Sequence, residues 1–209
     1  MVSPAVSETK SGLPVIAFLS AKDWGTWLTR EASSSKASKG LWLKLAKKDA
    51  GARSVTRQEA IEVALCHGWI DGQLDKYDDD WWLVRFTPRS PKSKWSEINR
   101  TAASRLIEEG RMLPGGLAQV KAAQADGRWD AAYASQRSAS VPADLQAALD
   151  ASPKAMRFFE TLDGANRFSI LYRVQDAKTV KTRVQRIEKF IGMLERGEVI
   201  HPAKKGANG

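Results

Sequence analysis

The stretch LWLKLAKK, residues 41–48, decides the fold because apolar and polar side chains alternate along it. Its three leucines face one side of an extended chain, whereas Trp42 and Lys44 face the other. This period of two residues is typical of a β-strand that buries one face. We therefore predict a sheet at the centre of the amino-terminal half.

A hairpin is expected next to this strand. The segment GWIDGQL (68–74) is followed by the acidic stretch YDDD (77–80) and by WWLVRF (81–86). Two apolar runs on either side of a short polar turn are typical of antiparallel strands. Because side chains alternate along a strand, Trp81 and Trp82 must point to opposite faces.

Helices surround these strands in the prediction. The capping-box pattern Thr56-Arg-Gln-Glu59 opens one helix. Other apolar residues at helical spacing predict helices over 20–31, 93–112 and 117–125. Leu113-Pro-Gly-Gly116 is interpreted as the stop of the helix that starts near Ser93.

The carboxy-terminal part is expected to be entirely helical, so the fold class is α+β: a small antiparallel sheet with packed helices, followed by a helical subdomain. The strongest helix, within 178–197, carries Val180, Val184, Ile187, Ile191 and Leu194 as one stripe. The predicted parts are a disordered start, an α+β domain, a linker, a helical subdomain and a disordered tail, at 1–13, 14–133, 134–141, 142–200 and 201–209.

Composition limits the classes of function. The chain has 209 residues, a net charge of +9, one cysteine and two histidines. The single Cys66 excludes an internal disulfide, and so few soft ligands disfavour a zinc site. No apolar run has the length of a membrane span, and Pro14 and Asp23 disfavour a secretion signal at the start. We expect a cytoplasmic protein without metal or cofactor.

Four segments together resemble the bacteriocin-protection family called YdeI/OmpD-associated, or OmdA-like. They are GLWLKLAKK (40–48), ALCHGWIDG (64–72), RFTPRSPKSKWSEIN (85–99) and the carboxy-terminal pair PADLQAAL (142–149) with AKTVKTRVQRIEKFIGML (177–194). The resemblance extends over nearly the whole chain from about residue 16. It implies protection against bacteriocins or cationic antimicrobial peptides, and it brings no catalytic residues.

A ligand site is predicted where the hairpin meets the proline-stiffened loop 85–95. Six basic residues against Glu97 give residues 85–105 a net charge of +5, and a helix start near Ser93 would favour an anion. Tryptophans would form the walls, basic side chains would hold an anionic small molecule or peptide, and Asp71 would orient an arginine. The predicted site residues are Trp69, Asp71, Trp82, Arg85, Thr87, Arg89, Lys92, Ser93 and Trp95.

Each feature also has a purely structural interpretation. Trp69 would be core and Asp71 would pair with an arginine, while Ser93 would only cap its helix. The hypothesis we favour is a non-enzymatic binding protein. One alternative is a nucleic-acid-binding accessory protein that uses the basic residues of 178–189. The other is an enzyme that relies on Asp71 or His67.

Overall fold

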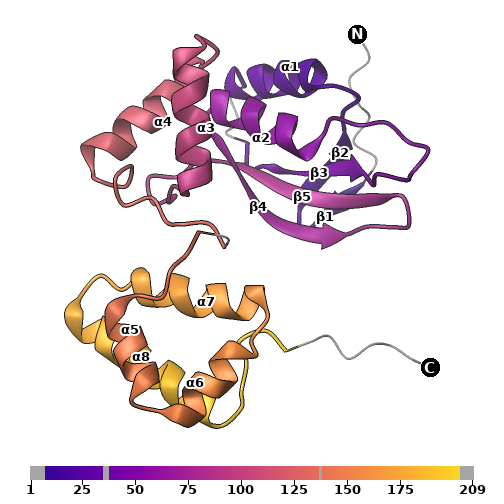
Figure 1. Ribbon diagram of the computed structural model, residues 1–209. Coiled ribbons are helices and arrows are strands. Elements are labelled where there is room, and N and C mark those ends of the chain that lie inside the picture. The colour runs from indigo at the N-terminus through magenta and orange to yellow at the C-terminus, as the bar shows by residue number, and fades with distance from the viewer. Residues whose placement is uncertain (1–7, 35–37, 137, 203–209) are drawn as a thin grey trace. The chain divides into compact units, whose positions relative to one another are not determined.

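The computed structural model describes residues 8–34, 38–136 and 138–202. The chain divides into two compact units, Met1–Ala132 and Tyr133–Gly209. The first combines a five-stranded sheet with packed helices and the second is helical (Figure 1), which confirms the predicted α+β class.

In the first unit the strands lie in the order β1-β2-β3-β5-β4. They are β1 (Thr9–Lys10), β2 (Leu13–Ala17), β3 (Leu41–Ala46), β4 (Trp69–Lys76) and β5 (Trp81–Pro88). The helices are α1 (Ala21–Ala32), α2 (Arg57–Cys66), α3 (Glu97–Glu108) and α4 (Pro114–Ala125). The hairpin of β4 and β5 is confirmed. The sheet is nevertheless mixed, because β2 runs parallel to β3.

The amino-terminal segment differs from the prediction of disorder up to residue 13. Residues 1–7 lie outside the described part of the chain, but Thr9–Lys10 and Leu13–Ala17 form strands. Ser11 and Gly12 join them with positive φ angles of 51° and 74°, as a two-residue hairpin turn requires. The segment is short and polar, so its sequence shows no strand pattern. The strand β1 is stabilised by its pairing with β2.

The sheet is strongly coiled, so that its first and last strands come together. Lys10 on β1 forms an ion pair of 2.7 Å with Asp75 on β4, and the Tyr77 hydroxyl after β4 donates to the Glu8 carboxylate. In a flat sheet, strands about 4.8 Å apart would separate these two edges by about 19 Å. On the face of the sheet away from α1 and α2, the coil encloses a small apolar cluster made of Leu13, Val15, Trp42 and Leu83.

The opposite face of the sheet carries the main core, packed against α1 and α2. Trp24 and Trp27 of α1 stack at 5.5 Å between ring centroids, and Trp24 meets Phe86 of β5 edge-on at the same separation. The three leucines of β3 are at most 1% exposed on this side. The predicted alternation in β3 is therefore confirmed, but Trp42 on the other face is only 4% exposed, so the strand buries side chains on both faces rather than on one.

The carboxyl end of α2 meets the amino end of α4 backbone to backbone. Leu113, before α4, donates its N–H to the Cys66 carbonyl at 3.2 Å. A Cβ on Gly68 would come within 2.7 Å of the Gly115 carbonyl, and one on Gly116 within 2.6 Å of the Cys66 carbonyl. The glycines allow the negative end of one helix dipole to face the positive end of the other.

Two predicted helix boundaries in this region are wrong. The helix expected from Ser93 begins at Glu97, because Ser96 caps it by accepting from the Asn99 N–H. Pro114-Gly-Gly116 does not stop that helix but opens α4, with proline in its first turn. The N–H groups in the first turn of a helix have no partner within the helix. A proline, which has no N–H, can therefore stand at the start of a helix as well as after its end.

The second unit contains α5 (Ala143–Asp150), α6 (Pro153–Glu160), α7 (Gly164–Gln175) and α8 (Val180–Glu195) around its own core. The predicted stripe of α8 is only partly right, because Val180 and Val184 are 80% and 47% exposed. Phe190 joins Ile187 and Leu194 in the core instead.

The predicted tail from residue 201 begins as an ordered contact. The backbone N–H of His201 donates to the Asn166 Oδ1 at 2.8 Å, and the Asn166 amide donates to the His201 carbonyl at 3.1 Å. Asn166 is itself 4% exposed, so this exchange satisfies a buried amide. Residues 203–209 lie outside the described part.

Candidate functional site

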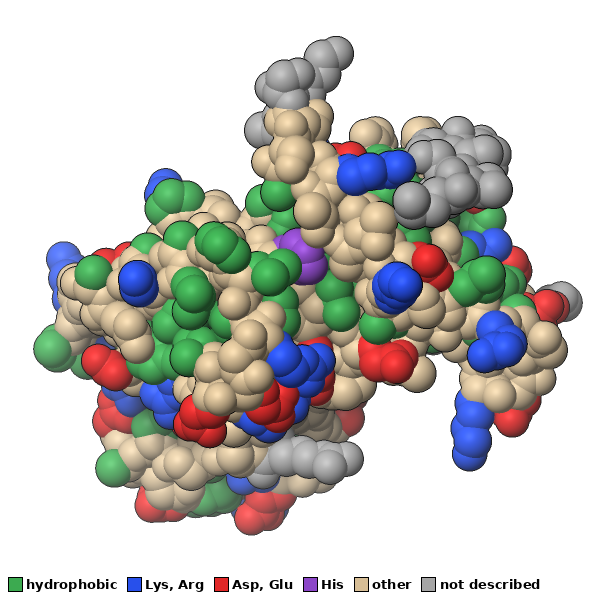
Figure 2. Space-filling model, turned by 90° about the horizontal axis from the view of Figure 1, so that it is seen from above, with side chains coloured by type: hydrophobic (Ala, Val, Ile, Leu, Met, Phe, Trp, Pro, Cys, Tyr) green, Lys and Arg blue, Asp and Glu red, His purple; other side chains and the backbone are tan. Residues whose placement is uncertain are grey.

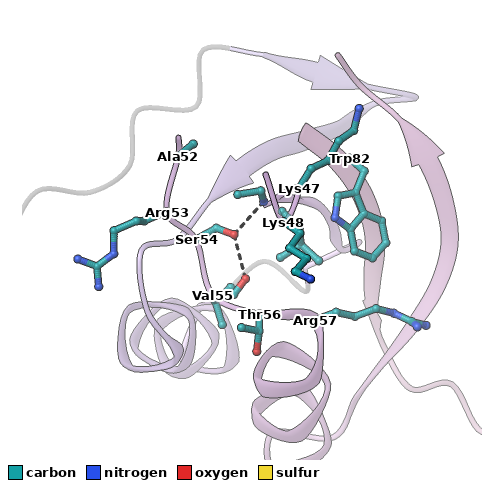
Figure 3. A pocket seen from close by; sticks show the side chains of 11 residues that line it. Lys47, Lys48, Ala52, Arg53, Ser54, Val55, Thr56, Arg57 and Trp82 are labelled. Atoms are coloured by element: carbon teal, nitrogen blue, oxygen red, sulfur yellow. Dashed lines mark hydrogen bonds between the residues drawn. The ribbon is translucent and has the colours of Figure 1, made fainter. Parts of the chain in front are cut away.

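A basic hollow lies in the first unit, where the end of β3, the following loop and the start of α2 surround Trp82 (Figure 3). Its volume is about 480 Å³, within the range that small-molecule sites occupy. The lining residues are Leu45, Ala46, Lys47, Lys48, Ala52, Arg53, Ser54, Val55, Thr56, Arg57 and Trp82. Four of these are cationic and none is acidic, so the lining favours an anion.

The loop that forms one wall is held by Ser54. Its hydroxyl accepts from the Ala46 N–H at 2.9 Å and donates to the Val55 carbonyl at 3.0 Å (Figure 3). Val55 is fixed further by donating its N–H to the Phe18 carbonyl at 2.8 Å. The wall is therefore held in place by main-chain and side-chain hydrogen bonds.

The start of α2 forms the second wall. Thr56 accepts from the Glu59 N–H, and the Glu59 carboxylate accepts from the Thr56 N–H at 2.9 Å, so the predicted capping box is confirmed. These bonds from the Thr56 backbone and hydroxyl lower the pKa of Glu59 below its ordinary value. Glu59 is thereby engaged at the helix end, and among the described residues it forms no ion pair with a cation of the hollow.

Two of the four cations already have partners. The Lys47 ammonium donates to the Asp78 carbonyl at 2.7 Å, and Arg57 pairs with Asp71 at 3.2 Å. Among the described residues, neither Lys48 nor Arg53 forms an ion pair. Lys48 extends along the hollow beside Val55, whereas Arg53 points outward from the loop (Figure 3).

Trp82 supplies the aromatic wall. It pairs with Leu45 across the β3–β5 ladder and so faces the helix side of the sheet. Only part of the side chain is buried, against the main core. Trp81 points to the opposite face, where the Lys44 ammonium lies 4.9 Å from its ring centroid. The predicted division of this tryptophan pair between the two faces holds.

Two residues of the predicted site have structural positions. Trp69 is 5% exposed and contacts Trp24 and Trp27 with centroid separations of 6.2 and 5.8 Å. Asp71 accepts from Arg57 at the edge of the hollow. The expectation that Asp71 orients an arginine agrees with this contact, but Trp69 forms core rather than a wall.

Arg85 and Thr87 lie on the other face of the sheet from Trp82. Arg85 pairs with Trp42 across the ladder, and its Nε is buried without a hydrogen-bond partner among the described residues. Thr87 is half-buried opposite Ile70. Strand alternation therefore separates both residues from the tryptophan with which they were grouped.

The remaining predicted residues form the loop after β5. Arg89 is 6% exposed, its guanidinium lies 3.6 Å from the Trp95 ring centroid, and it donates to the Lys94 carbonyl at 3.1 Å. Ser93 accepts from the Ser90 N–H inside a turn, and Lys92 is exposed. Arg89 thus fastens the loop to Trp95, and the three basic residues of the prediction do not converge.

The residues of the enzyme alternative also have structural contacts. The His67 Nδ1 lies 2.8 Å from the Val63 carbonyl and its Nε2 lies 3.3 Å from the Thr29 hydroxyl. We infer a proton on Nδ1, because a carbonyl only accepts. Burial raises the pKa of the neighbouring Cys66 thiol, which opposes a nucleophilic role.

The described residues contain no group of three or more His, Cys, Asp or Glu side chains placed to hold a metal ion. Asp78, in the acidic turn, instead accepts from the N–H groups of Asp80 and Trp81 at 2.9 and 2.8 Å. No helix in the described ranges has the length and apolarity needed to cross a bilayer.

The basic face expected on α8 is partly neutralised. Arg183 donates to Asp144 of α5 at 2.8 Å, and Arg186 lies 4.0 Å from Asp176. These ion pairs reduce the net positive charge of α8, a charge that nucleic-acid binding would favour. On another face, shown in Figure 2, Lys and Arg side chains are interspersed with Asp and Glu.

The hollow was not predicted, although the sequence contains a signal for it. Residues 47–57 contain four basic residues against Asp49, and the equally long segment 85–95 around Arg89 also contains four. The loop around Arg89 also contains prolines and a tryptophan, and these features favoured it as the predicted ligand site. Only the fold shows that Trp82 lies beside the earlier loop.

The fold defines a class: a basic α+β protein whose sheet unit has a hollow lined by cations and whose second unit, in its described residues, consists of four helices. Residues 138–197 match the family model described as Bacteriocin-protection, YdeI or OmpD-Associated (OmdA), so the helical unit carries a domain of that family. Residues 16–119 match a domain of unknown function, DUF8412, which includes the hollow. The recognised resemblance is therefore confirmed for part of the chain, and the GWIDG and FTPRSPKSKW motifs fall within the other domain.

No curated protein and no solved structure matches the chain. The OmdA domain suggests a function like bacteriocin protection.

Proposed function

We propose that this chain is a non-enzymatic cytoplasmic binding protein that captures an anionic ligand in the hollow around Trp82 and thereby serves a protective role. The observation that carries the proposal is the composition of that hollow: four cationic side chains, one partly exposed tryptophan and no carboxylate. The OmdA domain supports the protective part of the role.

Charge and preorganisation both support an anion in this place. The loop is fixed through Ser54 and Val55, so little ordering accompanies binding. The Lys48 ammonium forms no ion pair within the described residues, and binding an anion would therefore not require breaking one. The protein's net charge of +9 also attracts anions from a distance.

Titration calorimetry with pyrophosphate at fixed ionic strength tests the proposal. We expect saturable binding that Lys48→Glu weakens by about tenfold or more, since it replaces an attraction with a repulsion. Lys22→Glu makes the same charge change on the exposed side of α1 and should stay within about twofold of the original affinity. Absent binding, or equal losses in both variants, would contradict the proposal.

Protection is tested in the host. A strain that lacks this protein, complemented with the Lys48→Glu form, should survive a bacteriocin challenge no better than the uncomplemented strain. The Lys22→Glu form should restore survival. Full protection by the Lys48→Glu form would show that anion binding in the hollow is not needed for the protective role.

The nucleic-acid alternative receives less support from the surface. Its prediction is affinity that falls steeply with salt, because binding releases counterions from the phosphates. A gel shift at low ionic strength that disappears after reversal of Lys178, Lys181 and Lys189 would favour it over the proposal.

A further inference from the structure

We propose that the ligand of the hollow is a nucleotide, with its base stacked on Trp82 and its phosphates held by Lys48 and Arg53. This inference rests on the proposed function and specifies its ligand class. It follows from the different chemistry of the floor and the rim of the hollow.

The floor is apolar. Leu45 and Val55 lie beneath it and are each 1% exposed, so its accessible apolar surface comes from the half-buried Ala46, Ala52 and Trp82. Both hydroxyls that line the hollow are already engaged, since Ser54 makes two hydrogen bonds to the backbone and Thr56 donates to the Glu59 carboxylate. A bare inorganic anion would gain little from such a floor, whereas a planar apolar group would bury its surface there.

Trp82 offers a surface suited to a planar ring. Trp24, Trp69 and Trp95 are at most 5% exposed and lie against other rings or cations. Trp82 is only partly buried, and within the described ranges no aromatic ring or cationic group is stacked on it. Stacking of a base on an exposed aromatic side chain strengthens binding by about 5- to 150-fold.

The rim supplies the charge for the phosphates. Lys47 and Arg57 are engaged with Asp78 and Asp71, as described above. Lys48 and Arg53 remain without ion pairs among the described residues, on the same loop as the apolar floor. Arg53 points outward (Figure 3), so a rotation of its flexible side chain is needed to reach a phosphate at the mouth.

A nucleotide joins these two chemistries in one molecule. The volume of about 480 Å³ accepts a ligand of small-molecule size rather than a single ion. The length of a nucleoside diphosphate lets its base reach the floor while its phosphates stay at the rim. Neither adenosine nor pyrophosphate alone satisfies both parts of the hollow.

Calorimetry with ADP, pyrophosphate and adenosine on the full chain tests this inference. We expect ADP to bind at least about tenfold more tightly than pyrophosphate, from the stacking contribution. Trp82→Leu should bring the ADP affinity to within about threefold of the pyrophosphate affinity, and leave pyrophosphate binding within about twofold of its original value. Trp82→Phe should keep part of the preference for ADP, since a smaller ring still stacks.

The matched control is Trp81→Leu, on the opposite face of the same strand, which should keep the full preference for ADP. Far-UV circular dichroism confirms that each variant is folded. Equal affinities for ADP and pyrophosphate in the unaltered protein would overturn the nucleotide inference while the anion proposal stands. Binding of neither would overturn both, and tighter binding of a single-stranded oligonucleotide than of ADP would replace the nucleotide with nucleic acid.

Discussion

Gly68 shows how a single position fixes the junction between α2 and β4. Its φ of +77° is a left-handed conformation, and the Gly115 carbonyl lies where a Cβ would need space. Both glycines of the GWIDG motif are of the residue type that permits a close backbone approach. The structure requires glycine at the first, whereas a Cβ on Gly72 would find its nearest neighbour, the Arg85 carbonyl, at an ordinary 3.7 Å.

Gly68→Ala is therefore predicted to lower the free energy of unfolding by about 3 kcal/mol, from the left-handed backbone and the close contact together. Urea denaturation followed by tryptophan fluorescence measures this change. Gly72→Ala is the matched control and should change the same free energy by less than about 1 kcal/mol. Similar losses in the two variants would show that the contact between α2 and α4 is unimportant.

At the level of single side chains, the sequence predicted what kind of contact a residue makes but not which residue it contacts. The pairing of Asp71 with an arginine was foreseen, but Arg57 lies on a helix that the motif does not contain. Arg89 is predicted as a ligand contact because it lies in a basic loop that two prolines stiffen, before an expected helix start. Its position against Trp95 depends on a loop whose path the two prolines restrict but do not determine.

Among the elements, α2 depends on a carboxylate at its start. The Thr56 N–H and hydroxyl stabilise the ionised form of Glu59 and lower its pKa below the ordinary value of 4.5. A lowered pKa in the folded state adds stability at pH values above 4.5. That contribution is lost as the pH falls through the lowered value.

Glu59→Gln should therefore reduce the acid sensitivity of the first unit. We expect the unfolding free energy at pH 6 to be lower in this variant than in the original protein, and the two values to converge near pH 3. Urea denaturation at a series of pH values provides the measurement. Parallel curves over that range would mean that the capping box contributes no pH-dependent stability.

Element types were more predictable than element boundaries. The capping box, the β4–β5 hairpin and the alternation of β3 follow from local spacing, and the structure confirms each. The parallel pairing of β2 with β3 joins segments separated by a helix and a loop, and no local pattern records it. The observed start of α3 differs from the predicted one because Ser93 and Ser96 are equally suitable N-cap residues in the sequence. In the structure, Ser96 accepts the capping hydrogen bond.

At the scale of the whole molecule, each unit has its own apolar core. All eight tryptophans lie at or before Trp129 and hence in the first unit. Tryptophan fluorescence consequently reports on the sheet unit, whereas far-UV circular dichroism reports on both.

Leu149→Ala removes a fully buried side chain from the helical unit. We expect a loss of about 2–5 kcal/mol in the transition seen by circular dichroism, with the fluorescence midpoint unchanged. Leu106→Ala, equally buried in the first unit, should lower the fluorescence midpoint. If Leu149→Ala moves both signals together, the two units unfold as one.

The coil that joins β1 to β4 also affects how copies of the protein behave toward one another. Outer strands with unsatisfied backbone groups are templates for intermolecular pairing and aggregation. Here the Lys10–Asp75 ion pair and the Glu8–Tyr77 hydrogen bond hold the two outer strands against each other. Where β1 meets the end of β4, a further strand could therefore add to either edge only after these two contacts had broken.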